Sequence, residues 1–268
     1  MRVNPFKRIT RVFVFAALLA LPAVLAAQQT TCPPTPPPSS TVHGGLDVVG
    51  TCLVDQVTVN GGITIESGGH LQLTSSFVNG GIVTLPCGEI DLNATTNGGG
   101  VPTGTTDTVN GGIDIQASTV CPPGAFSDVD IWTAQIDGGI FITGSFGAIG
   151  GGLFSFPAIC NNTIKGNVNV DNLTTVISGV IGDPDGSDFF GRSCPGNVIT
   201  GAFRFSNSSV FAVEFNTIGG SALLTGNNTL EFNGNAIGGS AKCSSGTTIL
   251  PADGGDQPNT VHGSNQCP

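Results

Sequence analysis

The sequence predicts an all-β chain folded as a right-handed parallel β-helix, a β-solenoid of about ten short coils with disulfides. Three observations carry this prediction: a short glycine-containing phrase that recurs, strict apolar alternation within it, and an even cysteine count in an exported chain. No 3.6-residue apolar stripe is sustained after residue 27, and 41 Gly and 17 Pro disfavour long helices.

Residues 1–27 have the composition of a secretory signal peptide. A basic start precedes the apolar run 12–21, and a small-residue exit follows it. We expect cleavage after Ala26 or Ala27, because the peptidase pocket accepts only small side chains. The alternative, a membrane anchor, needs ~20 apolar residues, and this run is shorter. The sequence therefore predicts a secreted, extracellular protein with no membrane span after signal cleavage.

Removing the signal peptide leaves a strongly acidic chain. Lys165, Arg192, Arg204 and Lys242 then face 18 carboxylates, for a net charge of 4 − 18 = −14. Nucleic acids and anionic lipids are bound by clustered Lys and Arg, so this balance excludes nucleic acid as a partner.

The eight cysteines predict disulfides, because their number is even and the chain is exported. No two are close enough for a CxxC metal motif. The connectivity stays open, although cysteines one or two coils apart are natural partners in a stacked fold. The candidates are Cys32, Cys52, Cys87, Cys121, Cys160, Cys194, Cys243 and Cys267.

The expected solenoid domain covers residues 42–268 and follows a Pro-rich leader at 28–41. Its phrase reads β-branched, polar or small, Gly, Gly or small, apolar, any, apolar. Some steps between copies are 19 residues and others are longer, which indicates coils with insertions that form loops on one side. Copies begin at Val42, Val59, Val78, Val109, Ile136, Ile164, Ile199, Ile218, Ile237 and Val261.

The alternation after each glycine pair predicts strands with one face inward, and the glycines predict corners. We expect Asn60, Asn79 and Asn110 to form part of an internal amide ladder. An antiparallel sandwich or barrel is the alternative fold, but it does not require a constant phrase.

The C-terminal third contains Asn235-Ala236-Ile237-Gly238-Gly239, Cys243, Asn259-Thr260-Val261 and Gln266-Cys267. In these residues it resembles a group of uncharacterised secreted bacterial proteins predicted to be right-handed parallel β-helices. The resemblance covers roughly 70 residues, and its motifs are structural. It implies the fold, export, and a C-terminal cap closed by Cys243 and Cys267, but no activity.

The phrase Val-x-Gly-Gly-Ile-x-Ile is also similar to the coils of bactofilin-type polymer-forming proteins. Those proteins are cytosolic and lack a signal peptide and disulfides, so the resemblance does not by itself imply filament formation here. End-to-end stacking stays open for any poorly capped solenoid.

An enzymatic function is the second hypothesis, since parallel β-helices include polysaccharide lyases and hydrolases. A lyase acting on polyuronate needs basic groups, which are few and scattered here. A glycoside hydrolase needs two carboxylates, and the candidates are Asp128 with Asp130, and the cluster of three at 183, 185 and 188. The motifs of polygalacturonase-like enzymes are absent, and aromatic platforms are few, with no Tyr and one Trp.

The sequence Asp183-Pro184-Asp185-Gly186-Ser187-Asp188 places three carboxylates around a glycine turn. One hypothesis is that Asp183, Asp185 and Asp188 bind calcium, which would hold the surrounding insertion in place. A solvated turn is the alternative, and it is favoured because Cys194 stands where a calcium loop carries Glu.

The three histidines, His43, His70 and His262, have no carboxylate or Ser at a catalytic motif spacing. Ice binding is a third class, but Thr-x-Thr does not recur at coil spacing. We therefore predict a non-catalytic structural or surface-interaction protein, with a cell-surface protein or glycan as its partner; the alternative is a carbohydrate-active enzyme. A uniformly polar Asn/Thr/Ser face would favour the non-catalytic protein. A groove with carboxylates and exposed aromatic side chains would favour the enzyme.

Overall fold

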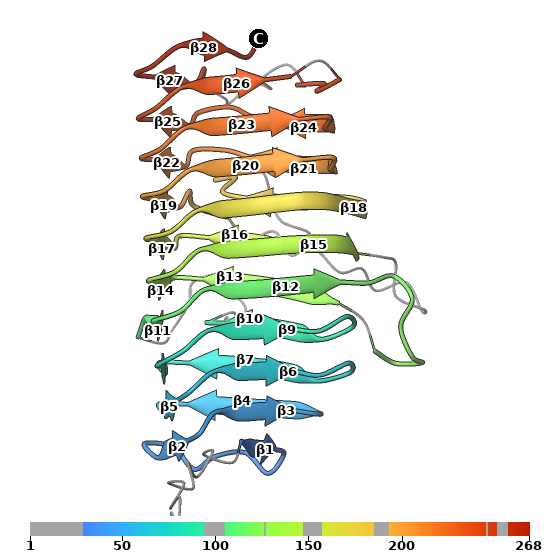
Figure 1. The fold of residues 1–268 in the computed structure, drawn as a ribbon, viewed down its shortest axis with the longest axis vertical. Coiled ribbons are helices and arrows are strands. Elements are labelled where there is room, and N and C mark those ends of the chain that lie inside the picture. The colour runs from blue at the N-terminus through green and yellow to red at the C-terminus, as the bar shows by residue number, and fades with distance from the viewer. Residues whose placement is uncertain are drawn as a thin grey trace, which may run out of the picture.

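The computed structural model describes residues 29–93, 105–125, 127–146, 157–184, 193–244, 246–250 and 257–268. These residues form short strands stacked as coils along one axis, with the N-terminal coil at one end and the C-terminal coil at the other (Figure 1). The described residues contain no helix, and hence none that could cross a membrane. The predicted signal peptide at 1–27 lies outside them.

Each coil contributes strands to three parallel ladders, here named A, B and C. Ladder A has ten strands: β2 (Thr41–His43), β5 (Thr58–Asn60), β8 (Phe77–Val78), β11 (Asp107–Val109), β14 (Ala134–Ile136), β17 (Thr163–Ile164), β19 (Val198–Ile199), β22 (Thr217–Ile218), β25 (Ala236–Ile237) and β27 (Thr260–Val261).

Ladder B follows ladder A in each coil. Its strands are β1 (Thr30–Cys32), β3 (Leu46–Val48), β6 (Ile63–Ile65), β9 (Ile82–Thr84), β12 (Ile113–Ala117), β15 (Ile140–Phe146), β18 (Val168–Ile181), β20 (Phe203–Ser206), β23 (Ala222–Thr225), β26 (Ala241–Cys243) and β28 (Asn265–Gln266).

Ladder C completes the coil. It consists of β4 (Thr51–Asp55), β7 (His70–Thr74), β10 (Glu89–Leu92), β13 (Asp128–Trp132), β16 (Ala158–Cys160), the second half of β18, β21 (Ser209–Val213) and β24 (Asn228–Glu231). Because β18 runs through both B and C, the two ladders join into one 18-stranded hydrogen-bonded sheet. The predicted fold class, a parallel β-helix, is confirmed.

The register of ladder A coincides with the recurring phrase. All ten phrase starts pair with one another in sequence order, from Val42 opposite Val59 to Ile237 opposite Val261. The turn from ladder A to ladder B has the same length in every coil. All length variation between coils therefore falls in the B-to-C and C-to-A connections. The turn from ladder A to ladder B carries no insertion in any coil.

The alternating apolar residues form one continuous core inside the three ladders. Inward positions such as Ile63, Ile82, Ile113 and Ile140 are fully buried and lie in a single column. Burying one aliphatic side chain stabilises the fold by about 1.5–3 kcal/mol. Because the coils above and below provide this burial, each coil is stabilised mainly by its neighbours.

The A-to-B turn requires glycine because consecutive coils approach closely there. A Cβ on Gly111 would lie 2.5 Å from the backbone nitrogen of Gly81. No side chain fits at that distance, so the glycine is required by stacking rather than by an unusual φ at this position.

The internal amide ladder exists, but the predicted residues for it are wrong. Asn60, Asn79 and Asn110 are exposed, and the amide of Asn110 bonds Asn79 in solvent. Their position follows an inward aliphatic residue, and alternation turns it outward. The internal ladder instead uses the residue just before ladder A in the C-terminal coils: Asn162, Asn197, Asn216, Asn235 and Asn259.

The eight cysteines form four disulfides, as predicted. The bonds join Cys32 to Cys52, Cys87 to Cys121, Cys160 to Cys194, and Cys243 to Cys267. Their sequence separations of 20 to 34 residues correspond to one coil with its insertion. The last bond joins the final two coils, as the resemblance to secreted β-helices implied.

Residues 29–40, which belong to the Pro-rich leader, form a partial first coil. Strand β1 pairs with β3, and the amide of Ser39 donates to the carbonyl of Gln56. The prolines between them lack backbone N–H groups, so this end of the solenoid offers few donors to a further strand.

Candidate functional site

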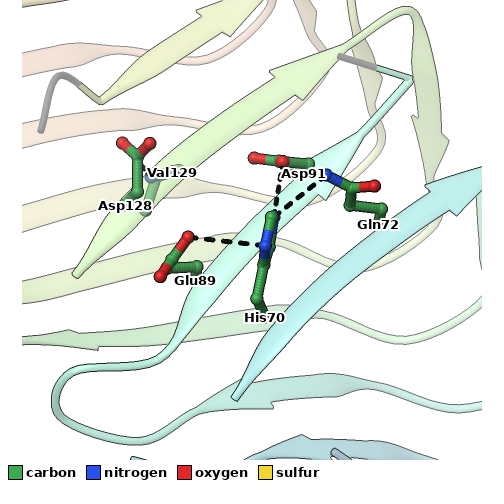
Figure 2. A network of polar contacts seen from close by, with 6 residues as sticks. All are labelled: His70, Gln72, Glu89, Asp91, Asp128 and Val129. Atoms are coloured by element: carbon green, nitrogen blue, oxygen red, sulfur yellow. Dashed lines mark hydrogen bonds and ion pairs between the residues drawn. The ribbon is translucent and has the colours of Figure 1, made fainter. Parts of the chain in front are cut away.

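The outward face of ladder C carries the main cluster of ionisable side chains. His70 on β7, Glu89 on β10 and Asp128 on β13 occupy one register position on three consecutive strands. Two residues further along, Asp91 and Asp130 form a second column. Figure 2 shows the imidazole of His70 between the carboxylates of Glu89 and Asp91, with Asp128 beyond Glu89.

The distances make His70 the centre of this cluster. Its Nε2 lies 2.8 Å from Asp91 Oδ2, and its Nδ1 lies 3.6 Å from Glu89 Oε2. The three side chains are 14–23 % exposed. The hydrogen bond to Asp91 raises the pKa of His70 above its ordinary value, and the charges of Asp91, Glu89 and Asp128 act in the same direction.

Glu89 responds to the same surroundings in another way. Burial raises its pKa, because desolvation disfavours the charged carboxylate, and His70 partly opposes this effect. A carboxyl group with a raised pKa beside a carboxylate is the arrangement that acid–base chemistry uses. The cluster therefore combines a proton donor and a proton acceptor.

The single tryptophan does not extend this site as a sugar platform. Trp132 is 1 % exposed and packs outside ladder C with Cys160 and Cys194. Its indole N–H donates to Asp130, the neighbour of Asp128 in the predicted carboxylate pair. Trp132 thus positions Asp130 and cannot stack on a ligand.

The predicted calcium cluster is only partly within the described residues. Asp183 is buried, and its backbone forms an antiparallel bridge with Cys194. Asp185 and Asp188 lie outside the described residues, so calcium binding stays a prediction. Within the described part of the chain, no group of three or more His, Cys, Asp and Glu side chains is arranged to hold a metal ion.

Sequence reasoning found Asp128 and Asp130 but missed His70, Glu89 and Asp91. Adding the 19-residue coil step to His70 gives Glu89, and adding it to Gln72 gives Asp91. This signal was present in the sequence. The distance of 39 residues from Glu89 to Asp128 contains an insertion, and only the structure shows that these two residues are neighbours.

The outward face of ladder A, here called face A, is a second candidate surface. It presents two columns of side chains, and each described member is exposed or half-buried. The first column is Thr41, Thr58, Phe77, Thr108, Gln135, Thr163, Val198, Thr217, Ala236 and Thr260. The second is His43, Asn60, Asn79, Asn110, Asp137, Lys165, Thr200, Gly219, Gly238 and His262.

Face A is electrically balanced, in contrast to the chain as a whole. Its one carboxylate, Asp137, accepts a hydrogen bond from Lys165 of the next coil at 2.7 Å. This bond lowers the pKa of Asp137 and keeps it ionised. Among the described residues of face A, the charges of Asp137 and Lys165 cancel.

Comparisons with protein-family models, curated proteins and solved structures give no match to this chain.

Proposed function

We propose that this chain is a secreted, non-catalytic β-solenoid that binds a partner through face A. The observation that carries the proposal is the exposed, mainly polar array without net formal charge that extends across the ten strands of ladder A. Export is supported by the signal-like residues 1–27 and by the four disulfides.

The neutrality of face A indicates an uncharged partner. The other faces carry the acidic residues, for example Asp47 and Asp114 on ladder B and Glu89 on ladder C. A cationic partner would bind those faces, and an anionic partner would be repelled by the net charge of the whole molecule.

The chemistry of face A favours a hydroxyl-rich partner. Thr hydroxyls and Asn amides both donate and accept hydrogen bonds, as sugar hydroxyls do. Strands in a ladder are ~4.8 Å apart, so face A repeats its groups along a line of ten strands. Phe77 and Val198 add apolar contacts for the C–H groups of sugar rings. We therefore infer a neutral, linear polysaccharide as the partner class.

Cosedimentation of the signal-free, oxidised protein with insoluble neutral glucans and with a polyuronate tests this proposal. We expect binding to a neutral glucan only, and a loss of at least tenfold in affinity for Thr163→Glu, because it places a charge on face A. Thr143→Glu is the matched control, since Thr143 is also exposed but lies on ladder B. Equal binding by both variants, or preference for the polyuronate, would contradict the assignment of face A.

A carbohydrate-active enzyme is the second candidate, and the His70–Glu89–Asp91–Asp128 cluster is the observation that favours it. A carboxyl with a raised pKa supplies an acid, and a neighbouring carboxylate supplies a base. Reducing-end release from a polysaccharide panel measures this activity. Turnover that disappears in Asp128→Asn and Glu89→Gln, but persists in Asp114→Asn, would replace the non-catalytic proposal.

A further inference from the structure

Asp107 stands, two coils before Asn162, at the position that the internal ladder fills with asparagine, and it is a buried carboxyl group with an incomplete set of hydrogen bonds. It occupies the register position of Ser76 in the preceding coil and Ala134 in the next. Its residue is 0 % exposed. Its Oδ1 accepts a hydrogen bond of 2.8 Å from the amide of Ser76, while Oδ2 has no partner.

The asparagines of the C-terminal coils show what this position normally requires. The side-chain oxygen of Asn162 accepts from the amide of Ala134, and its Nδ2 donates to the carbonyl of Ile131, three residues before Ala134. Asn235 and Asn259 repeat this arrangement with the carbonyls of Val213 and Phe232. A ladder residue thus uses one acceptor and one donor.

An ionised Asp107 supplies the acceptor but not the donor. By the same register, its second oxygen corresponds to the Nδ2 that donates to the carbonyl three residues before Ser76, which is that of Leu73. A carboxylate oxygen facing a carbonyl oxygen is unfavourable in a buried site, whereas a protonated carboxyl restores the donor. Nearby, Asn93 Oδ1 is also buried without a partner, which increases the excess of acceptors in this corner.

We propose that Asp107 takes part in the ladder as a protonated carboxyl, so that loss of this proton weakens the N-terminal coils. The stability of the N-terminal coils then depends on pH, and this dependence does not involve face A. Burial is the main cause that raises the pKa of Asp107 to about 7. Hydrogen bonds from the backbone amides of Ser76 and Asn93 act in the opposite direction and lower this pKa.

The surroundings of Asp107 contain little else that titrates. The neighbouring ladder residues Ser76 and Ala134 carry no ionisable group. In the described part of the chain, the one charge that acts on it is Asp55 at the end of β4, which also raises its pKa. Among the described residues, Asp55 is therefore the one charged group whose substitution should also change the titration of Asp107.

The sign of the effect follows from linkage. The folded-state pKa of about 7 exceeds the ordinary value of 3.8, so the stabilisation is fully present below pH 3.8 and is lost as pH rises through about 7. Within that window the unfolding equilibrium constant should increase by up to about tenfold per pH unit.

Chemical unfolding of the oxidised protein from pH 4 to pH 8 tests the proposal, together with a carboxyl-carbon NMR titration of Asp107. His70 and Glu89 supply part of the wild-type loss of stability with rising pH, because their pKa values are also raised. We expect Asp107→Asn to remove the remainder, because the amide supplies the missing donor at every pH. Asp114→Asn, on the outward face of the next strand, should keep it. Asp107→Ala should have a lower free energy of unfolding than Asp107→Asn at every pH measured. A wild-type pH slope shared by Asp107→Asn, or titration of the Asp107 carboxyl near pH 4, would overturn the proposal.

Discussion

The internal asparagine ladder provides the most direct test of what holds the C-terminal coils together. Asn216 is 1 % exposed and connects three coils. Its Oδ1 accepts from the backbone amide and the Nδ2 of Asn197, both at 2.9 Å. Its Nδ2 donates to the carbonyl of Ile181 at 2.7 Å and to Asn235 Oδ1 at 3.1 Å. Truncation to Ala removes all of these bonds.

The expected loss for Asn216→Ala is about 2–4 kcal/mol, since each buried group left unpaired costs ~1–3 kcal/mol. The backbone amide of Asn197 loses its acceptor, whereas Asn197 Nδ2 keeps the carbonyl of Ile159. A loss of this size is a large part of the ~5–15 kcal/mol by which domains are usually stable.

Urea unfolding, followed by the fluorescence of Trp132 and by circular dichroism, measures this loss. Trp132 is the single tryptophan and is buried, so its emission reports the central coils, and circular dichroism reports all of them. Asn110→Ala is the control, because its amide makes an exposed bond with Asn79, and we expect a change within ~0.5 kcal/mol. A loss for Asn216→Ala no larger than for Asn110→Ala would refute the structural role of the ladder.

Three further predictions concern stacking, the cap and the ladder C cluster. Gly111→Ala should destabilise the fold by more than ~2 kcal/mol, because its Cβ would clash with the backbone of Gly81, whereas Gly50→Ala meets only ordinary contacts; thermal unfolding of both variants checks this. Replacing Cys243 and Cys267 together by Ser should cost ~2–4 kcal/mol, and faster hydrogen exchange confined to the last coils would show that the bond acts as a cap. His70→Gln should flatten the profile of unfolding free energy against pH above pH 6.5. Because the pKa of His70 is raised in the folded state, its stabilising contribution is present below pH 6.5 and is lost as pH rises through the folded-state pKa. An unchanged profile would exclude the ion pairs of His70 as a source of stability.

The sequence by itself determined the fold class and the register of ladder A. The β-branched residue of each phrase is inward in every coil, from Val42 to Val261, because strand alternation and the glycine pair fix that position locally. The even cysteine number likewise indicated disulfides, and their spacing of about one coil indicated which neighbours could meet.

Other features depended on which strand lies next to which, and only the tertiary structure decided them. The polar residue of each phrase, such as Asn79, faces solvent, while an Asn two residues before the inward aliphatic forms the internal ladder. Glu89 and Asp128 meet although an insertion separates them, because the strands that carry them are neighbours in ladder C. Asp107 is likewise buried because of the coils that lie next to it in the stack. A side chain acquires its neighbours from the coils above and below, and the number of residues separating those coils is not constant along the chain.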